Sequence, residues 1–284
     1  MTIEGRGEDM TVQREPRLRT STPREEFDRF TQELVTSVSA RDDVVGLVLL
    51  GSGADTARVD EWSDHDFYLV STPGAQEALR TDLSWLPRSV SIVLAARETE
   101  HGLKVVYDDG HVLEFAVADL DEVRGFGTNH WRVVLDRGGV AEAVGSAAQV
   151  THARPGRPAR DAVGLAVTLV LIAAGRARRG ETLTAQRSVA QAVDLVLEAV
   201  TARIASADPA VTDVLDARRR AEAAYPDVAA ALSQALMAAP EEGARRVLDA
   251  AEGVLARGWD GWPHAAVAAV RRRLSWARPD LEQA

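Results

Sequence analysis

The chain has 284 residues, of which 46% are hydrophobic and none is cysteine. A chain of this length can bury two modest cores, so two domains are expected. The formal net charge of −10 argues against a protein that binds nucleic acid through a basic surface, and the lack of cysteine excludes disulfides and thiolate metal sites.

The first 20 residues are polar and charged, with almost no apolar side chains. This composition predicts a disordered tail, and we expect no signal peptide in it. The longest apolar run, residues 162–175, is shorter than the about 20 residues that a membrane-spanning helix needs. We therefore expect a cytoplasmic protein that does not enter a membrane.

A first domain is expected over residues 21–150. Its first helix is predicted to begin at Ser21-Thr22-Pro23, where a hydroxyl cap precedes a proline and early acids. The near-continuous apolar run at 44–50 predicts a central strand covered on both faces. Asp109-Gly110 favours a tight turn between two antiparallel strands. The other elements predicted in this part of the chain are strands at 67–70, 90–95, 103–107 and 112–117 and a short helix at 75–83.

The second half of the chain changes to alanine, leucine, valine and arginine with helical periodicity. It predicts an all-helical domain over residues 151–284, with residues 124–158 as the connection to it. Trp259, Trp262 and Trp276 are expected to close the helical core, and Arg271-Arg272-Arg273 to form a solvated face. The predicted helices are 162–178, 184–205, 209–225, 228–237 and 241–256.

A cluster of polar residues interrupts the apolar pattern of the first domain. Gly51 and Ser52 end the strand at 44–50, and Asp64 and Asp66 stand at the head of the next strand. Two carboxylates at positions i and i+2 of a strand project from the same face, and their repulsion is costly unless a cation lies between them. Glu114 is the one acid in a later apolar strand and is the candidate for a third carboxylate. These residues predict a metal site held by oxygen ligands.

The spacing of Gly51-Ser52, a loop, and then Asp64-x-Asp66 resembles the nucleotidyltransferase superfamily with the polymerase beta-like fold. EWSDHDFYLV and DDGHVLEFAV are similar to segments of small-molecule nucleotidyltransferases, including aminoglycoside and lincosamide adenylyltransferases. The resemblance implies an α+β fold, in which a mixed β-sheet domain with flanking helices is followed by an all-α helical bundle. It also implies that Asp64, Asp66 and Glu114 are catalytic and hold Mg²⁺ in a two-ion site, and that Gly51 and Ser52 bind the phosphates of ATP or another nucleoside triphosphate.

The implied reaction is transfer of a nucleoside monophosphate to a hydroxyl of a small molecule, of which an antibiotic is one candidate. Two alternatives remain open: modification of a protein side chain, as in antitoxin-like members, and a nucleotide-binding module without turnover. Taken singly, the residues also suit simpler roles. Glu114 would suit an exposed edge strand, Lys104 an ordinary surface position, and His65, which faces away from the two aspartates, a structural position.

Overall fold

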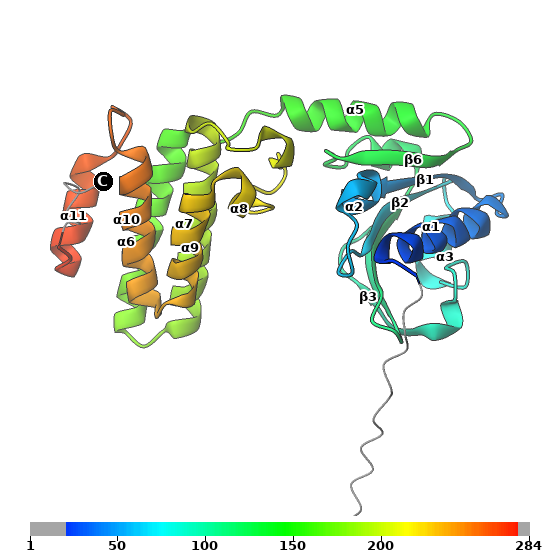
Figure 1. Cartoon of the computed structure of the whole chain (residues 1–284), viewed down its shortest axis with the longest axis horizontal. Coiled ribbons are helices and arrows are strands. Elements are labelled where there is room, and N and C mark those ends of the chain that lie inside the picture. Colours follow the sequence, from blue (N-terminus) through cyan, green and yellow to red (C-terminus); the bar gives the residue numbers. More distant parts are fainter. Residues whose placement is uncertain (1–20, 278–284) are drawn as a thin grey trace, which may run out of the picture. The chain divides into compact units, whose positions relative to one another are not determined.

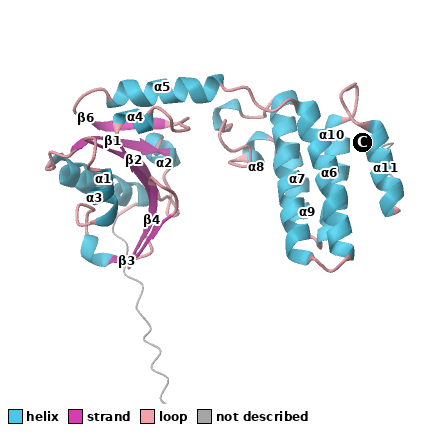
Figure 2. Ribbon diagram, turned by 180° about the vertical axis from the view of Figure 1, so that it is seen from behind, coloured by secondary structure: helices cyan, strands magenta, loops and turns pink. Residues whose placement is uncertain are grey.

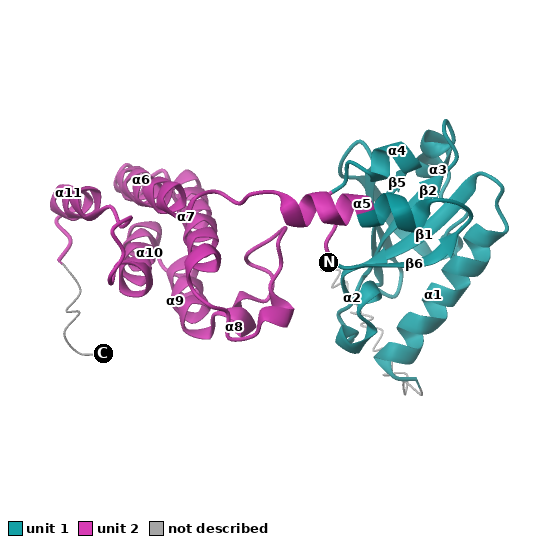
Figure 3. Ribbon diagram, turned by 90° about the horizontal axis from the view of Figure 1, so that it is seen from above, with its two compact units in different colours: residues 1–126, 130–145 teal, residues 127–129, 146–284 magenta. Residues whose placement is uncertain are grey.

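The computed structural model of the chain describes residues 21–277 (Figure 1). The tail predicted at 1–20 lies outside these residues. The chain divides into two compact units (Figure 3). Unit 1 runs to residue 126 and resumes at 130–145, whereas unit 2 takes 127–129 and the chain from 146 onward. The sequence places this boundary near 150.

Unit 1 is built on a six-stranded mixed sheet with the strand order β3-β4-β5-β2-β1-β6. The pair β2 and β5 is parallel, and every other neighbouring pair is antiparallel. Its strands are β1 (Val44–Leu50), β2 (His65–Ser71), β3 (Ile92–Arg97), β4 (Gly102–Tyr107), β5 (Val112–Ala118) and β6 (Trp131–Asp136).

Two hydrophobic clusters cover the sheet of unit 1. On one face, side chains of β1, β2, β4 and β5 pack against α1 (Pro23–Ser39) and α3 (Gln76–Thr81). On the other face, β1 and β2 pack against α4 (Leu120–Val123) and the first turns of α5 (Val140–Ala153). The second cluster does not include β3 or β4. The opposite face of β4 and of the start of β5 is therefore left half-exposed.

Local sequence explains where several elements of unit 1 begin and turn. Thr22 and Glu25 form a reciprocal capping box at the start of α1, which satisfies two backbone NH groups that the first helical turn leaves unpaired. Gly110 has a φ of +87° in the turn between β4 and β5, a conformation that favours glycine. The predicted hairpin and first helix are thus present in the structure.

The described part of unit 2 contains helices and loops and no strand (Figure 2). Its largest cluster joins the buried faces of the long helices and includes Trp262, with Trp259 and Trp276 packed at the margin. No helix in residues 21–277 is both long and apolar enough to cross a membrane. The principal helices are α6 (Ala159–Arg178), α7 (Thr182–Arg203), α9 (Pro226–Met237), α10 (Pro240–Leu255) and α11 (His264–Leu274), with a short α8 (Ala221–Ala224) before α9.

Three sequence predictions are wrong in detail. Residues 124–158 are not only a connection, because they contain the edge strand β6 and the helix α5. The helix expected at 209–225 is mostly loop, in which Asp213 accepts hydrogen bonds from two backbone NH groups and so competes with helix formation. Arg271 does not lie on a solvated face: it is 3% exposed and its guanidinium contacts Asp249 and Glu252 at 2.8 and 2.6 Å.

Candidate active site

The acids of the motif are brought together by the pairing of two parallel strands. Asp66 on β2 is directly opposite Glu114 on β5. Because side chains alternate along a strand, Asp66 and Glu114 share the half-exposed face, while His65 and Phe67 point into the core. Neighbouring strands lie about 4.8 Å apart, so the two carboxylates can face one ligand.

Asp64 and the Gly51-Ser52 turn lie at the end of the sheet where β1 ends and β2 begins. Asp64 immediately precedes β2 and is half-buried. Gly51 begins α2 (Gly51–Ala54), a single helical turn at the end of β1, and has a φ of +51°. A Cβ placed on Gly51 would lie 3.6 Å from Asp66 Oδ2. The glycine backbone therefore lies against the carboxylate that the motif supplies.

Two arginines donate hydrogen bonds to backbone carbonyls of the Gly51–Gly53 turn. Arg58 donates to the Gly51 carbonyl at 2.9 Å, and Arg132 on β6 donates to the Gly53 carbonyl at 2.9 and 3.2 Å. Each guanidinium takes up a carbonyl oxygen of the turn, which fixes its backbone. Sequence reasoning missed both arginines, because the segment of β6 has the composition of a connection and because Arg58 belongs to no motif.

Asp66, Glu114 and Lys104 form a row of side chains across β2, β5 and β4, with Lys104 as its third member. It lies on β4 directly opposite Glu114, and its Nζ is 2.8 Å from Glu114 Oε1 and 3.2 Å from a carboxylate oxygen of Glu98. The hydrogen bond to Glu114, followed by that to Glu98, raises the pKa of Lys104. The sequence left open an ordinary surface lysine or one paired with an acid or phosphate; in the structure Lys104 is 41% exposed and paired with a candidate catalytic acid.

His65 occupies the core between the two aspartates in sequence. It is 1% exposed, its ring stacks on Phe27 with centroids 3.7 Å apart, and its Nε2 lies 3.3 Å from the Phe27 carbonyl. The tautomer with the proton on Nε2 satisfies the Phe27 carbonyl, and in that tautomer Nδ1 accepts from His111 Nε2 at 2.8 Å. Burial, and secondarily His111, lower the pKa of His65 to about 3. His65 is therefore a neutral structural residue that anchors the head of β2, as the sequence indicated.

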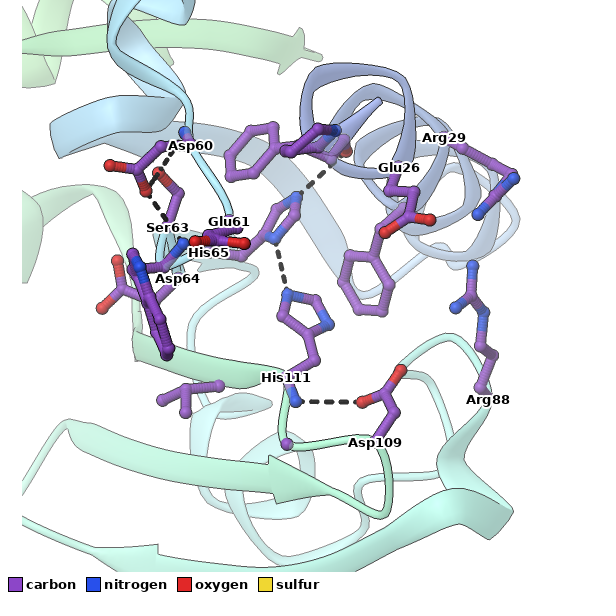
Figure 4. Close-up of a pocket in the computed structure, with 16 residues that line it drawn as sticks. Glu26, Arg29, Asp60, Glu61, Ser63, Asp64, His65, Arg88, Asp109 and His111 are labelled. Atoms are coloured by element: carbon purple, nitrogen blue, oxygen red, sulfur yellow. Dashed lines mark hydrogen bonds between the residues drawn. The ribbon is translucent and has the colours of Figure 1, made fainter. Parts of the chain in front are cut away.

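A polar pocket of about 540 Å³ lies on the His65 side of the strand head (Figure 4). Asp64 lines it, but Asp66, Glu114, Gly51 and Ser52 do not. His65 and Asp66 project to opposite faces of β2. The row formed by Asp66, Glu114 and Lys104 thus lies outside this pocket, and Asp64 is the one acid of the motif that borders it.

The acids at the head of β2 fit a divalent cation of the magnesium type. Within residues 21–277, no group of three or more histidine, aspartate or glutamate side chains is gathered closely enough to form a metal cage. Magnesium is commonly held by one or two carboxylates, with waters and substrate phosphates completing its coordination. Asp64 and Asp66 are the two carboxylates that would hold such an ion, and Glu114 contacts Lys104.

Comparison with solved structures gave distant likenesses, including the two that follow. An aminoglycoside 6-adenyltransferase from Bacillus subtilis has 13% identity and a TM-score of 0.28, covering 88% of this chain and 92% of that one. A nucleotidyltransferase-like protein from Exiguobacterium sibiricum has 13% identity and a TM-score of 0.30, covering 87% and 80%. Both are proteins of the kind that the motifs resemble, but likenesses this distant do not identify the reaction of this chain. No family model and no curated protein matches the chain.

Proposed function

We propose that the protein is a magnesium-dependent nucleotidyltransferase that moves a nucleoside monophosphate, AMP from ATP in the simplest case, to a hydroxyl of a small molecule. The observation that carries this proposal is the register of β2 and β5, which sets Asp66 opposite Glu114 on a half-exposed sheet face with Gly51 against Asp66. Nucleoside triphosphates and magnesium are abundant in the cytoplasm, which is the proposed location.

Each residue of the site would have a separate role in the reaction. The backbone of Gly51 and the hydroxyl of Ser52 would bind the β and γ phosphates. Asp64 and Asp66 would hold magnesium, which when bound neutralises charge on the phosphates. Glu114 would accept the proton of the acceptor hydroxyl.

The bond changes are those of a single displacement at phosphorus. The acceptor oxygen forms a bond to the α phosphorus while the bond from that phosphorus to the bridging oxygen breaks. Pyrophosphate leaves with the electron pair of the broken bond, and the proton passes to Glu114. Because the protein does little covalent work in such a transfer, positioning and charge neutralisation dominate the rate.

The test is incubation with each labelled nucleoside triphosphate, magnesium and a panel of hydroxylated small molecules, including antibiotics, with mass analysis of the acceptors afterwards. We expect one acceptor to gain the mass of a nucleoside monophosphate. Asp66→Asn should lower the rate by at least about 100-fold while the fold is retained. Asp42→Asn, which changes an exposed acid just before β1, is the matched control. Wild-type turnover by Asp66→Asn on an identified acceptor would disprove the metal assignment.

Glu114→Gln provides a separate test. It should retain nucleotide binding, because the amide keeps the shape of the side chain, but lose most of kcat, because an amide does not accept the proton. Unchanged kcat would reduce Glu114 to a surface acid. Mass gain on a co-purified protein in place of every small molecule would favour the protein-modifying alternative.

A further inference from the structure

Lysine is almost absent from this chain. Of its 33 lysines and arginines, only Lys104 is a lysine. The other ion pairs that a lysine or arginine forms within residues 21–277 use arginine, as in Arg88 with Glu33 and Arg97 with Glu77. The one lysine lies on the half-exposed face of the sheet, in register with Glu114.

The contacts of Lys104 place its charge between two carboxylates. Its Nζ is 2.8 Å from Glu114 Oε1 and 3.2 Å from Glu98 Oε1, and its side chain is 41% exposed. In the row across β2, β5 and β4, Asp66 and Lys104 flank Glu114 from opposite sides. A cation held by Asp64 and Asp66 would therefore lie on one side of Glu114, and the Lys104 ammonium lies on the other side.

The chemistry of lysine suits this position better than that of arginine. A guanidinium is a planar fork that engages both oxygens of a carboxylate, whereas an ammonium is a compact point charge. In the structure Lys104 contacts Oε1 of Glu114. A point charge can be paired with Oε1 alone, whereas a bidentate arginine would engage both oxygens of the carboxylate. A compact charge is also the side-chain feature that most closely matches a small metal ion.

We infer that the Lys104 ammonium takes the place of the second divalent cation at the Glu114 side of the site, so that the protein binds one divalent ion for each nucleotide. This inference rests on the proposed function and replaces the two-ion site that the sequence implies. Glu114 then binds Lys104 through Oε1 and accepts the proton of the acceptor through Oε2. An ordinary cross-strand pair would instead contribute to the stability of the sheet and nothing else.

The first experiment counts bound ions without requiring turnover. Mn²⁺ is titrated into the full chain with a nucleotide analogue that has a methylene group between the α and β phosphorus atoms. The bound ion is measured by the loss of the free Mn²⁺ paramagnetic resonance signal, and the bound nucleotide is measured in parallel. We expect one Mn²⁺ for each nucleotide bound to the wild-type protein. Two ions for each nucleotide would overturn the inference and leave the proposed function standing.

The second experiment observes the lysine itself. Because the chain has one lysine, selective ¹³Cε-lysine labelling gives a single resonance that belongs to Lys104. This resonance should shift when the nucleotide analogue and Mg²⁺ are added together. An unmoved resonance at saturating nucleotide would overturn the inference. If no nucleotide binds at all, the proposed function fails and this inference fails with it.

The third experiment separates a role in the reaction from a role in the fold. Lys104→Met keeps most of the aliphatic stem and removes the charge. It should lower kcat by about 100-fold, while the nucleotide Kd and the unfolding midpoint stay close to wild type. Arg97→Met is the matched control, because it removes a cation of similar exposure from the neighbouring strand β3. Wild-type kcat in Lys104→Met, or a loss of stability that accounts for the loss of activity, would overturn the inference.

Discussion

The buried histidine at the head of β2 should make the stability of unit 1 depend on pH. His65 is 1% exposed and its pKa is lowered from 6.5 to about 3, first by burial and then by the neighbouring His111. The unfolded chain therefore binds more protons than the folded chain between pH 6.5 and 3. The contribution of His65 to the free energy of unfolding is therefore fully present above pH 6.5 and is lost as the pH falls from 6.5 toward 3.

The size of the effect can be worked out from the shift. One pKa unit corresponds to about 1.4 kcal/mol, so that the shift of His65 is worth about 5 kcal/mol once the pH has reached 3. At pH 5 the unfolded imidazole is almost fully protonated while the folded one is still neutral. The contribution of His65 to the free energy of unfolding should therefore fall by about 2 kcal/mol between pH 7 and pH 5.

The assay is urea unfolding of the full chain at pH 7, 6 and 5, compared between wild type and His65→Gln. The variant will be less stable at pH 7, because the glutamine does not stack on Phe27. Between pH 7 and pH 5, however, its free energy of unfolding should fall by about 2 kcal/mol less than that of the wild type. Thr31→Val is the control, since it removes a hydroxyl 3.0 Å from His65 Nε2 and leaves the imidazole in place. It should keep the wild-type pH dependence. Parallel pH profiles for wild type and His65→Gln would refute the reasoning.

Three further changes test the packing, each read from the midpoint of denaturant unfolding. Gly46→Ala should destabilise the protein by about 1–3 kcal/mol, because a Cβ there would lie 2.5 Å from Val140 Cγ2; an unchanged midpoint would contradict the seating of α5 on β1. Arg271→Met should cost about 3–5 kcal/mol, because it leaves the buried Glu252 without the guanidinium 2.6 Å away; a loss below about 1 kcal/mol, the level of an exposed pair, would contradict this. Gly164→Ala, inside α6 with nothing within 4 Å of the added Cβ, should instead raise stability by about 0.5–1 kcal/mol, and a lower midpoint would be the contrary result.

The sequence by itself determined the features that depend on neighbours along the chain. The apolar run of β1, the hydroxyl cap and proline at the start of α1, and the Asp109-Gly110 turn are local signals, and each produced the expected element. The outward direction of Asp66 and the inward direction of His65 were also predictable from sequence, because alternation along a strand is a local property.

The tertiary structure decided which distant residues meet. Trp131–Asp136 became a strand only because the edge of β1 was open to pair with it, and the burial of Arg271 depended on acids about 20 residues earlier in the chain. The row of Asp66, Glu114 and Lys104 likewise exists through strand register. A one-residue slip would have turned these side chains to the other face. The sequence could therefore nominate Glu114 as the third acid and Lys104 as a residue able to pair with an acid, but only the folded sheet showed that the two pair with each other.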